Sequence, residues 1–110
     1  MKIIIIGLLT LLSFNARSIS PDEQLIYMRL LNSSELSEVK LGAKAMHNER
    51  PQDQALWDHT AYILWTINTT TDKDNDNFND TNAWLIRALT EYNNPRYRAM
   101  LTQLQKAKQP

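Results

Sequence analysis

The sequence predicts an all-α protein of four to five helices, arranged as two stacked antiparallel helical hairpins behind a signal peptide. Glycine occurs only at Gly7 and Gly42, and Asn-Gly hairpin dipeptides are absent, which argues against β-structure. Apolar residues recur with helical spacing through the rest of the chain. A short phrase is also repeated about 43 residues later, as expected when one helical hairpin follows another.

Residues 1–18 are predicted to be a secretory signal peptide, and residues 19–110 the folded domain. Met1-Lys2 supplies a positive start, residues 3–12 form an apolar run, and Ala16-Arg17-Ser18 offers small residues for cleavage. The run is too short for a membrane span, and the alternatives are a buried helix or an uncleaved anchor. We therefore expect a periplasmic or secreted protein. The absence of cysteine favours a bacterial periplasm, since small secreted eukaryotic domains usually need disulfides.

The charge balance argues against nucleic-acid and membrane partners. Lys2 and Arg17 leave with the signal peptide, so 10 of the 12 basic residues remain beside 12 acidic ones, a net charge of −2. Such a domain has no basic excess for binding phosphates or an anionic membrane surface. The remaining expectation is a protein partner.

The first helix is predicted from the capping pattern Ser20-Pro21-Asp22-Glu23. Serine is a favoured helix cap, proline fits the first turn, and the glutamate completes a capping box with the serine. Apolar residues up to Leu31 form one side of this helix, which ends at Asn32-Ser33-Ser34.

The second helix is predicted to begin near Ser34, because apolar residues then recur with the spacing of one helical face. They are Leu36, Val39, Ala43 and Met46. Gly42 lies inside this helix, where glycine costs about 1 kcal/mol relative to alanine. We therefore expect another helix to approach closely at Gly42.

The third helix, from about Asp53 to Asn68, is predicted to be the central one. Two apolar stripes cover much of its circumference, so it should pack on both sides. The stripes comprise Leu56, Thr60, Ile63, Leu64 and Ile67, and beside them Trp57, Ala61 and Trp65. A polar, acidic stretch over residues 68–80 separates this helix from the next.

Two further helices complete the predicted domain. The fourth is expected to be capped by Asp80 or Thr81 and to bury one apolar stripe. Asn94 is predicted to cap the fifth, with Pro95 in its first turn. The fifth helix ends in lysines, which suit the negative end of a helix dipole.

One phrase occurs twice in this domain. Its two copies, 43 to 44 residues apart, are Lys44-Ala45-Met46, Pro51 and Ala55-Leu56-Trp57, and then Arg87-Ala88-Leu89, Pro95 and Ala99-Met100-Leu101. Over residues 34–107 the pattern resembles HEAT-type α-helical repeats of small exported bacterial proteins. The resemblance implies a binding scaffold and brings no catalytic residues with it. Because solenoids usually need three or more repeats, we expect the first helix or a partner to cover one end.

An acidic loop is the candidate metal site. Aspartates stand at positions one, three, five and nine, as at the start of a calcium loop, and they are Asp72, Asp74, Asp76 and Asp80. Ala83 occupies position twelve, where such loops have a bidentate glutamate, so calcium would bind weakly, at roughly millimolar concentration. The alternative is a solvated loop in which Asp80 only caps a helix.

Four side chains are candidates for binding a protein partner. Tyr62 and Trp65 lie off the main stripe of the third helix, and Arg96 and Arg98 belong to a small basic set near the last helix that would suit an acidic partner. The alternatives are that the aromatic residues are core and the arginines are solvated. We also expect an exposed apolar patch near Trp65 or on the first helix.

The sequence thus predicts an exported, non-enzymatic helical-repeat module that mediates protein–protein interaction. Nucleophile motifs are absent, and the two histidines, His47 and His59, lack the spacing of a zinc protease. The alternative function is a low-affinity calcium-binding domain that uses the acidic loop. No cofactor other than calcium is predicted.

Overall fold

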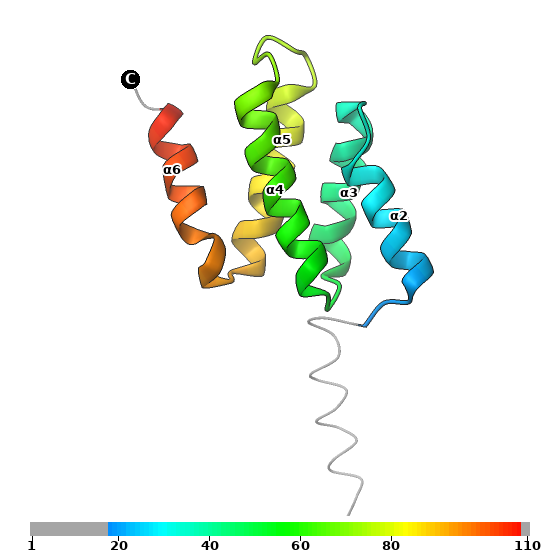
Figure 1. Cartoon of the computed structure of the whole chain (residues 1–110). Coiled ribbons are helices and arrows are strands. Elements are labelled where there is room, and N and C mark those ends of the chain that lie inside the picture. The colour runs from blue at the N-terminus through cyan, green and yellow to red at the C-terminus, as the bar shows by residue number, and fades with distance from the viewer. Residues whose placement is uncertain (1–17, 109–110) are drawn as a thin grey trace, which may run out of the picture.

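The structure is a computed structural model and describes residues 18–108; the predicted signal peptide, except for Ser18, lies outside the described residues (Figure 1). The described part is built from helices and contains no strand, which confirms the predicted all-α class. The helices are α2 (Pro21–Leu31), α3 (Leu36–Glu49), α4 (Gln54–Thr70), α5 (Phe78–Tyr92), a 3-10 turn η1 (Pro95–Tyr97) and α6 (Arg98–Lys108). Within this part of the chain, no helix is both long enough and apolar enough to cross a membrane.

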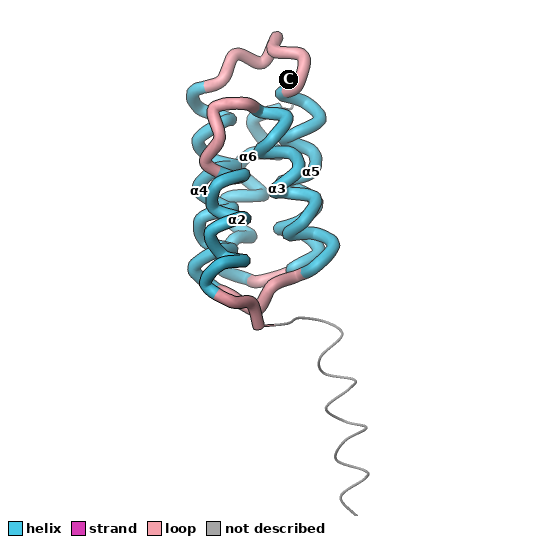
Figure 2. The backbone as a smooth tube through the Cα atoms, turned by 90° about the vertical axis from the view of Figure 1, so that its right-hand side faces the viewer, coloured by secondary structure: helices cyan, strands magenta, loops and turns pink. Residues whose placement is uncertain are grey.

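Successive helices run up and down, so each is antiparallel to the one before it (Figure 1). Viewed along the array, α2 and α4 lie on one side, and α3 and α5 lie on the other (Figure 2). The most extensive backbone contact joins α3 to α5, followed by α2 with α3 and α4 with α5. The helices α2 and α6 therefore stand at opposite ends of the array (Figure 1).

The start of α2 and its contact with α3 agree with the sequence patterns. Ser20 and Glu23 form the predicted capping box, because each side chain accepts a hydrogen bond from the other residue's backbone N–H, at 3.1 and 3.0 Å. Gly42 of α3 lies against the end of α2: a Cβ added there would stand 3.1 Å from Leu30 Cβ and 3.2 Å from Leu31 Cδ2. The glycine is therefore where the two helices come closest, as expected.

The helix α4 was predicted to be the central one, but it lies on one side of the array with α2, and the most extensive contact joins α3 to α5. The aromatic anchor of α4 is Trp57. Trp57 is fully buried, and its indole N–H donates to the carbonyl of Pro51 at 2.9 Å, so its single polar atom is satisfied. Seven side chains of α4 are buried and form one broad face of the helix, but Trp65 of the predicted second stripe is 39% exposed. The seven buried side chains are Leu56, Trp57, Thr60, Ala61, Ile63, Leu64 and Ile67.

The repeated phrase occupies corresponding places in the structure. Its first copy runs from the end of α3 into α4 and its second from the end of α5 into α6, and α3 and α5 pack side by side. Each helix is followed by a residue with a left-handed backbone, Arg50 (φ 47°) and Asn93 (φ 58°), whose N–H donates to the carbonyl of Met46 or Leu89. Both Met46 and Leu89 are buried. The helices α3 and α5 thus end in the same way, with a left-handed residue and the same backbone hydrogen bond.

Two predicted helix starts differ from the structure. The fourth predicted helix, α5, begins at Phe78 rather than after Asp80 or Thr81, because the Phe78 side chain is buried in the core. Asp80 is therefore in the first turn of α5 and does not cap it. Pro95 opens the 3-10 turn η1, and α6 begins at Arg98. The cap itself is as predicted: the Asn94 side chain accepts a hydrogen bond from the N–H of Arg96.

Candidate functional site

Tyr62 and Trp65 are both exposed on α4, with 60% and 39% of their surface accessible. They are three residues apart, so they lie on one face of the helix. Asp58 precedes Tyr62 by one helical turn and extends the same face towards the start of α4. We call the set Asp58, Tyr62 and Trp65 the α4 stripe. It presents two large aromatic side chains beside a carboxylate.

Arg96 lies beside Asp58, the residue of the α4 stripe nearest the start of the helix. Its Nε lies 3.2 Å from Oδ1 of Asp58, and the hydroxyl of the neighbouring Tyr97 donates to the same oxygen at 2.7 Å. Gln54 in turn donates to the Tyr97 hydroxyl at 2.6 Å. Burial, together with the bond to Asp58, raises the pKa of the Tyr97 phenol well above its usual value. This network fixes η1 on α4 and thereby holds Arg96 beside the stripe.

His59 borders the α4 stripe and connects α4 to α2. Its Nε2 lies 2.7 Å from Oδ1 of Asn32, and its ring lies 5.8 Å from that of Tyr62. Partial burial lowers the pKa of His59. Because the Asn32 amide oxygen can only accept, Nε2 of His59 donates its N–H to it.

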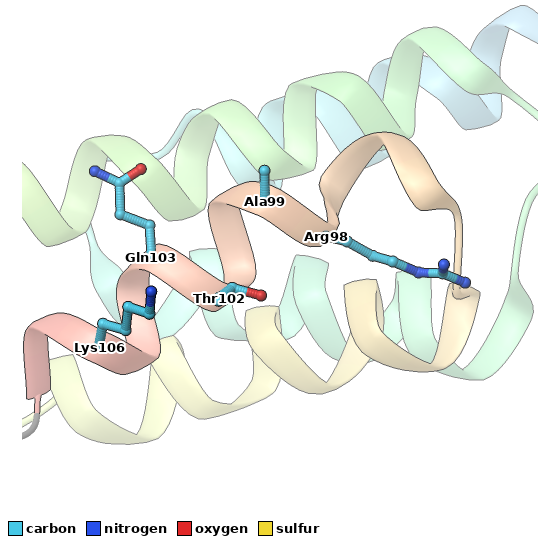
Figure 3. A pocket seen from close by; sticks show the side chains of 5 residues that line it. All are labelled: Arg98, Ala99, Thr102, Gln103 and Lys106. Atoms are coloured by element: carbon cyan, nitrogen blue, oxygen red, sulfur yellow. The ribbon is translucent and has the colours of Figure 1, made fainter.

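Arg98 does not belong to the α4 stripe. It begins α6, where its guanidinium donates to the Asn93 side chain at 3.3 Å. A shallow groove of about 510 Å³ runs along α6 from Arg98 to Lys106, and Figure 3 shows the side chains that line it. The lining residues are Arg98, Ala99, Thr102, Gln103 and Lys106. The structure thus separates the two arginines that the sequence analysis grouped together.

Two of the four predicted calcium residues, Asp72 and Asp80, make separate side-chain contacts in the structure. The carboxylate of Asp72 accepts a hydrogen bond from the N–H of Asp74, which shapes the turn after α4. Asp80 forms a 2.8 Å ion pair with Lys40 of α3, and this hydrogen bond lowers the pKa of Asp80. Across residues 18–108, no three His, Cys, Asp or Glu side chains gather in an arrangement that would hold a metal ion.

A second apolar surface lies at the α2 end of the array. Leu25 and Ile26 of α2 are exposed at 65% and 57%, so the first helix does present the expected apolar patch. Ile26 also lines a groove of about 240 Å³ between α2 and α3, which we call the α2–α3 groove. The residues that line it are Glu23, Ile26, Tyr27, Leu30, Ala45 and Glu49. Sequence reasoning did not find this groove, because it forms only where two helices meet.

The cations of the repeated phrase have a packing role. Lys44 Nζ and Arg87 Cζ lie 5.2 and 4.7 Å from the ring centroid of Trp84, which stands between α3 and α5. His47 meets the same indole edge-on and also reaches Glu91, 2.9 Å away. Cation–π contacts of this kind contribute about 0.5–1 kcal/mol each at exposed sites. The cations of both copies therefore contact the same indole ring.

Comparison of the chain with protein-family models, with curated proteins and with solved structures found no match.

Proposed function

We propose that this protein is an exported, non-enzymatic helical module that binds another protein. The observation that supports this most is the set of large apolar side chains left exposed on well-formed helices. They are Leu25, Ile26, Leu41, Tyr62 and Trp65. Tyr62 and Trp65 adjoin on one face of α4, and exposed apolar groups that lie side by side are a mark of interaction sites.

The α4 stripe is the surface that we assign to the partner. Tyr62 and Trp65 combine apolar area with a polar group, the composition that dominates binding energy in protein interfaces. Asp58 and Arg96 form an ion pair beside them at distances typical of a hydrogen-bonded contact. The stripe is thus an aromatic centre with a polar border, which matches the anatomy of an interface.

The histidines support a non-enzymatic role. His59 contacts Asn32 and His47 contacts Glu91, so each ring bridges two helices. Each histidine ring therefore has a structural role, which is to hold two elements together. The protein-binding proposal needs no reacting group from either.

Site-specific photo-crosslinking tests the proposal. A photoreactive amino acid replaces Tyr62 in one version of the protein and Thr90, an exposed polar position on α5, in a matched control. After illumination in living cells, we expect one discrete adduct from position 62 and none from position 90. Mass spectrometry of the adduct identifies what was bound.

Equal labelling from positions 62 and 90, or none from either, would contradict the proposal. A version with Trp65→Ser and the probe at position 62 should lose most of the adduct, because half of the aromatic surface is removed. Persistence of the adduct in that version would indicate that the partner binds outside the α4 stripe.

A further inference from the structure

The α2–α3 groove is the apolar end of the helix array. Ile26 is 57% exposed and Leu41, which is 53% exposed, lies one turn before Ala45 on the same face of α3. The helices α4 and α5 pack against one side of the α2–α3 pair, which stands at the end of the array, and no further helix within residues 18–108 follows it there (Figure 1). Stacked helices ordinarily bury such a face against a neighbouring helix.

Carboxylates border this groove. Glu23 and Glu49 line it from α2 and α3, and both engage local donors: Glu23 closes the capping box and Glu49 accepts a hydrogen bond from the Tyr27 hydroxyl. Asp22 is an exposed neighbour in the first turn of α2. A helix that fits this groove therefore needs an apolar or small-residue surface flanked by cations.

The opposite end of the array presents such a surface. Helix α6 spans residues 98–108 and contains no acidic residue, while Arg98 and Lys106 line its outer groove (Figure 3). Ala99 and Thr102 lie between them and are small enough to let another helix approach. Arg98 and Lys106 are eight residues apart, about 12 Å along the helix axis.

We propose that the α2–α3 groove binds α6 of a second copy of this chain, head to tail. This inference goes beyond the proposed function, because it uses two surfaces other than the α4 stripe. The stems of Arg98 and Lys106, with Ala99, cover Ile26 and Leu30, while the cationic heads face Glu23 and Glu49. A groove-to-groove dimer would instead bring like carboxylates together, which is unfavourable.

Head-to-tail contact uses two different surfaces of each chain, so it extends into open assemblies. The test uses purified protein and sedimentation velocity over a range of concentrations. Ile26→Glu disables the groove, and Arg98→Glu with Lys106→Glu disables α6. Leu25→Glu is the matched control, because Leu25 is the neighbouring exposed residue that does not line the groove.

We expect the parent protein and Leu25→Glu to associate as their concentration rises. In Ile26→Glu, and in the double variant Arg98→Glu with Lys106→Glu, the dissociation constant should rise at least about tenfold. An equimolar mixture of the two disabled variants should form a heterodimer and grow no further, because only one working contact remains. Raising NaCl from about 50 to about 500 mM should weaken association of the parent protein, since exposed charges are screened.

Circular dichroism establishes that each variant keeps its helices, and Ile26→Ser replaces Ile26→Glu if the latter unfolds. Association that survives Arg98→Glu with Lys106→Glu but not Ile26→Glu would indicate a symmetric dimer and overturn the inference. A monomer at every concentration would also overturn it. In that case an adduct from position 62 would still support the proposed function, whereas the absence of both would remove both proposals.

Discussion

Trp57 of α4 and Tyr92 of α5 stack with their ring centroids 4.0 Å apart and their planes inclined by 6°. Tyr92 in turn lies 6.2 Å from Tyr97 of η1. One aromatic column therefore joins α4, α5 and the turn that leads into α6. Because the column connects three elements, its loss should destabilise the whole domain.

We expect Trp57→Ala to lower the free energy of unfolding by about 3–5 kcal/mol, because it leaves a large cavity beside Tyr92. Trp65→Ala is the matched control, since Trp65 lies on the same helix and is 39% exposed. It should cost about 1 kcal/mol or less. Chemical denaturation followed by circular dichroism measures both, and similar losses would contradict this account of the core.

Substitution of Gly42 should test the contact between α2 and α3. Alanine gains about 1 kcal/mol of helix propensity, but its Cβ would meet Leu30 Cβ at 3.1 Å, an atom fixed to the backbone. Overpacking of this kind costs about 1–3 kcal/mol, so we expect Gly42→Ala to destabilise the domain slightly and Gly42→Val strongly. Ser37→Ala, on the exposed side of α3, should not destabilise it. Thermal melts that show Gly42→Val to be neutral would refute the close approach.

The histidine between α2 and α4 should make stability depend on pH. Burial lowers the pKa of His59 in the folded state, so the unfolded chain binds its proton more readily. Stability should therefore fall as the pH drops below about 6.5, the unfolded value. We expect His59→Gln to flatten this part of the profile, as measured by urea unfolding between about pH 5 and pH 8. An unchanged slope in the variant would assign the effect to another group.

The acidic loop makes a separate prediction. Because Asp80 pairs with Lys40 and the loop carboxylates do not converge, we expect calcium at about 1 mM to leave the melting temperature unchanged. A rise in melting temperature that Asp74→Asn abolishes would instead support the alternative calcium-binding function. The ion pair itself can be checked separately. Lys40→Ala should return the pKa of Asp80 towards its ordinary value, as measured by a carbon-detected NMR titration.

Local signals were sufficient for much of the fold. The capping box of Ser20 and Glu23 depends on four consecutive residues, and the broad buried face of α4 follows from its main apolar stripe. The predicted central position of α4 was wrong, because the apolar content of one helix does not show which helices it meets. The close approach at Gly42 was also predictable, because a glycine inside a helix needs a packing reason. These features depend on neighbours in the sequence or on helical periodicity alone.

Features that depend on distant partners were not predictable. Phe78 stands alone in a polar stretch, and only its place in the core explains why α5 begins there. Tyr97 and Arg96 meet Asp58 across 38 or more residues, so no local pattern reveals their network. The α2–α3 groove has the same origin, because neither helix has a hollow of its own.

The weak attachment of α6 has one more consequence. This helix meets the remainder of the molecule mainly through η1 and a limited contact with α5. Its amide hydrogens should thus exchange with solvent ahead of those in α4, by transient detachment of α6 alone. The helix that we propose to bind a second copy is then also the one whose detachment disturbs the rest of the fold least.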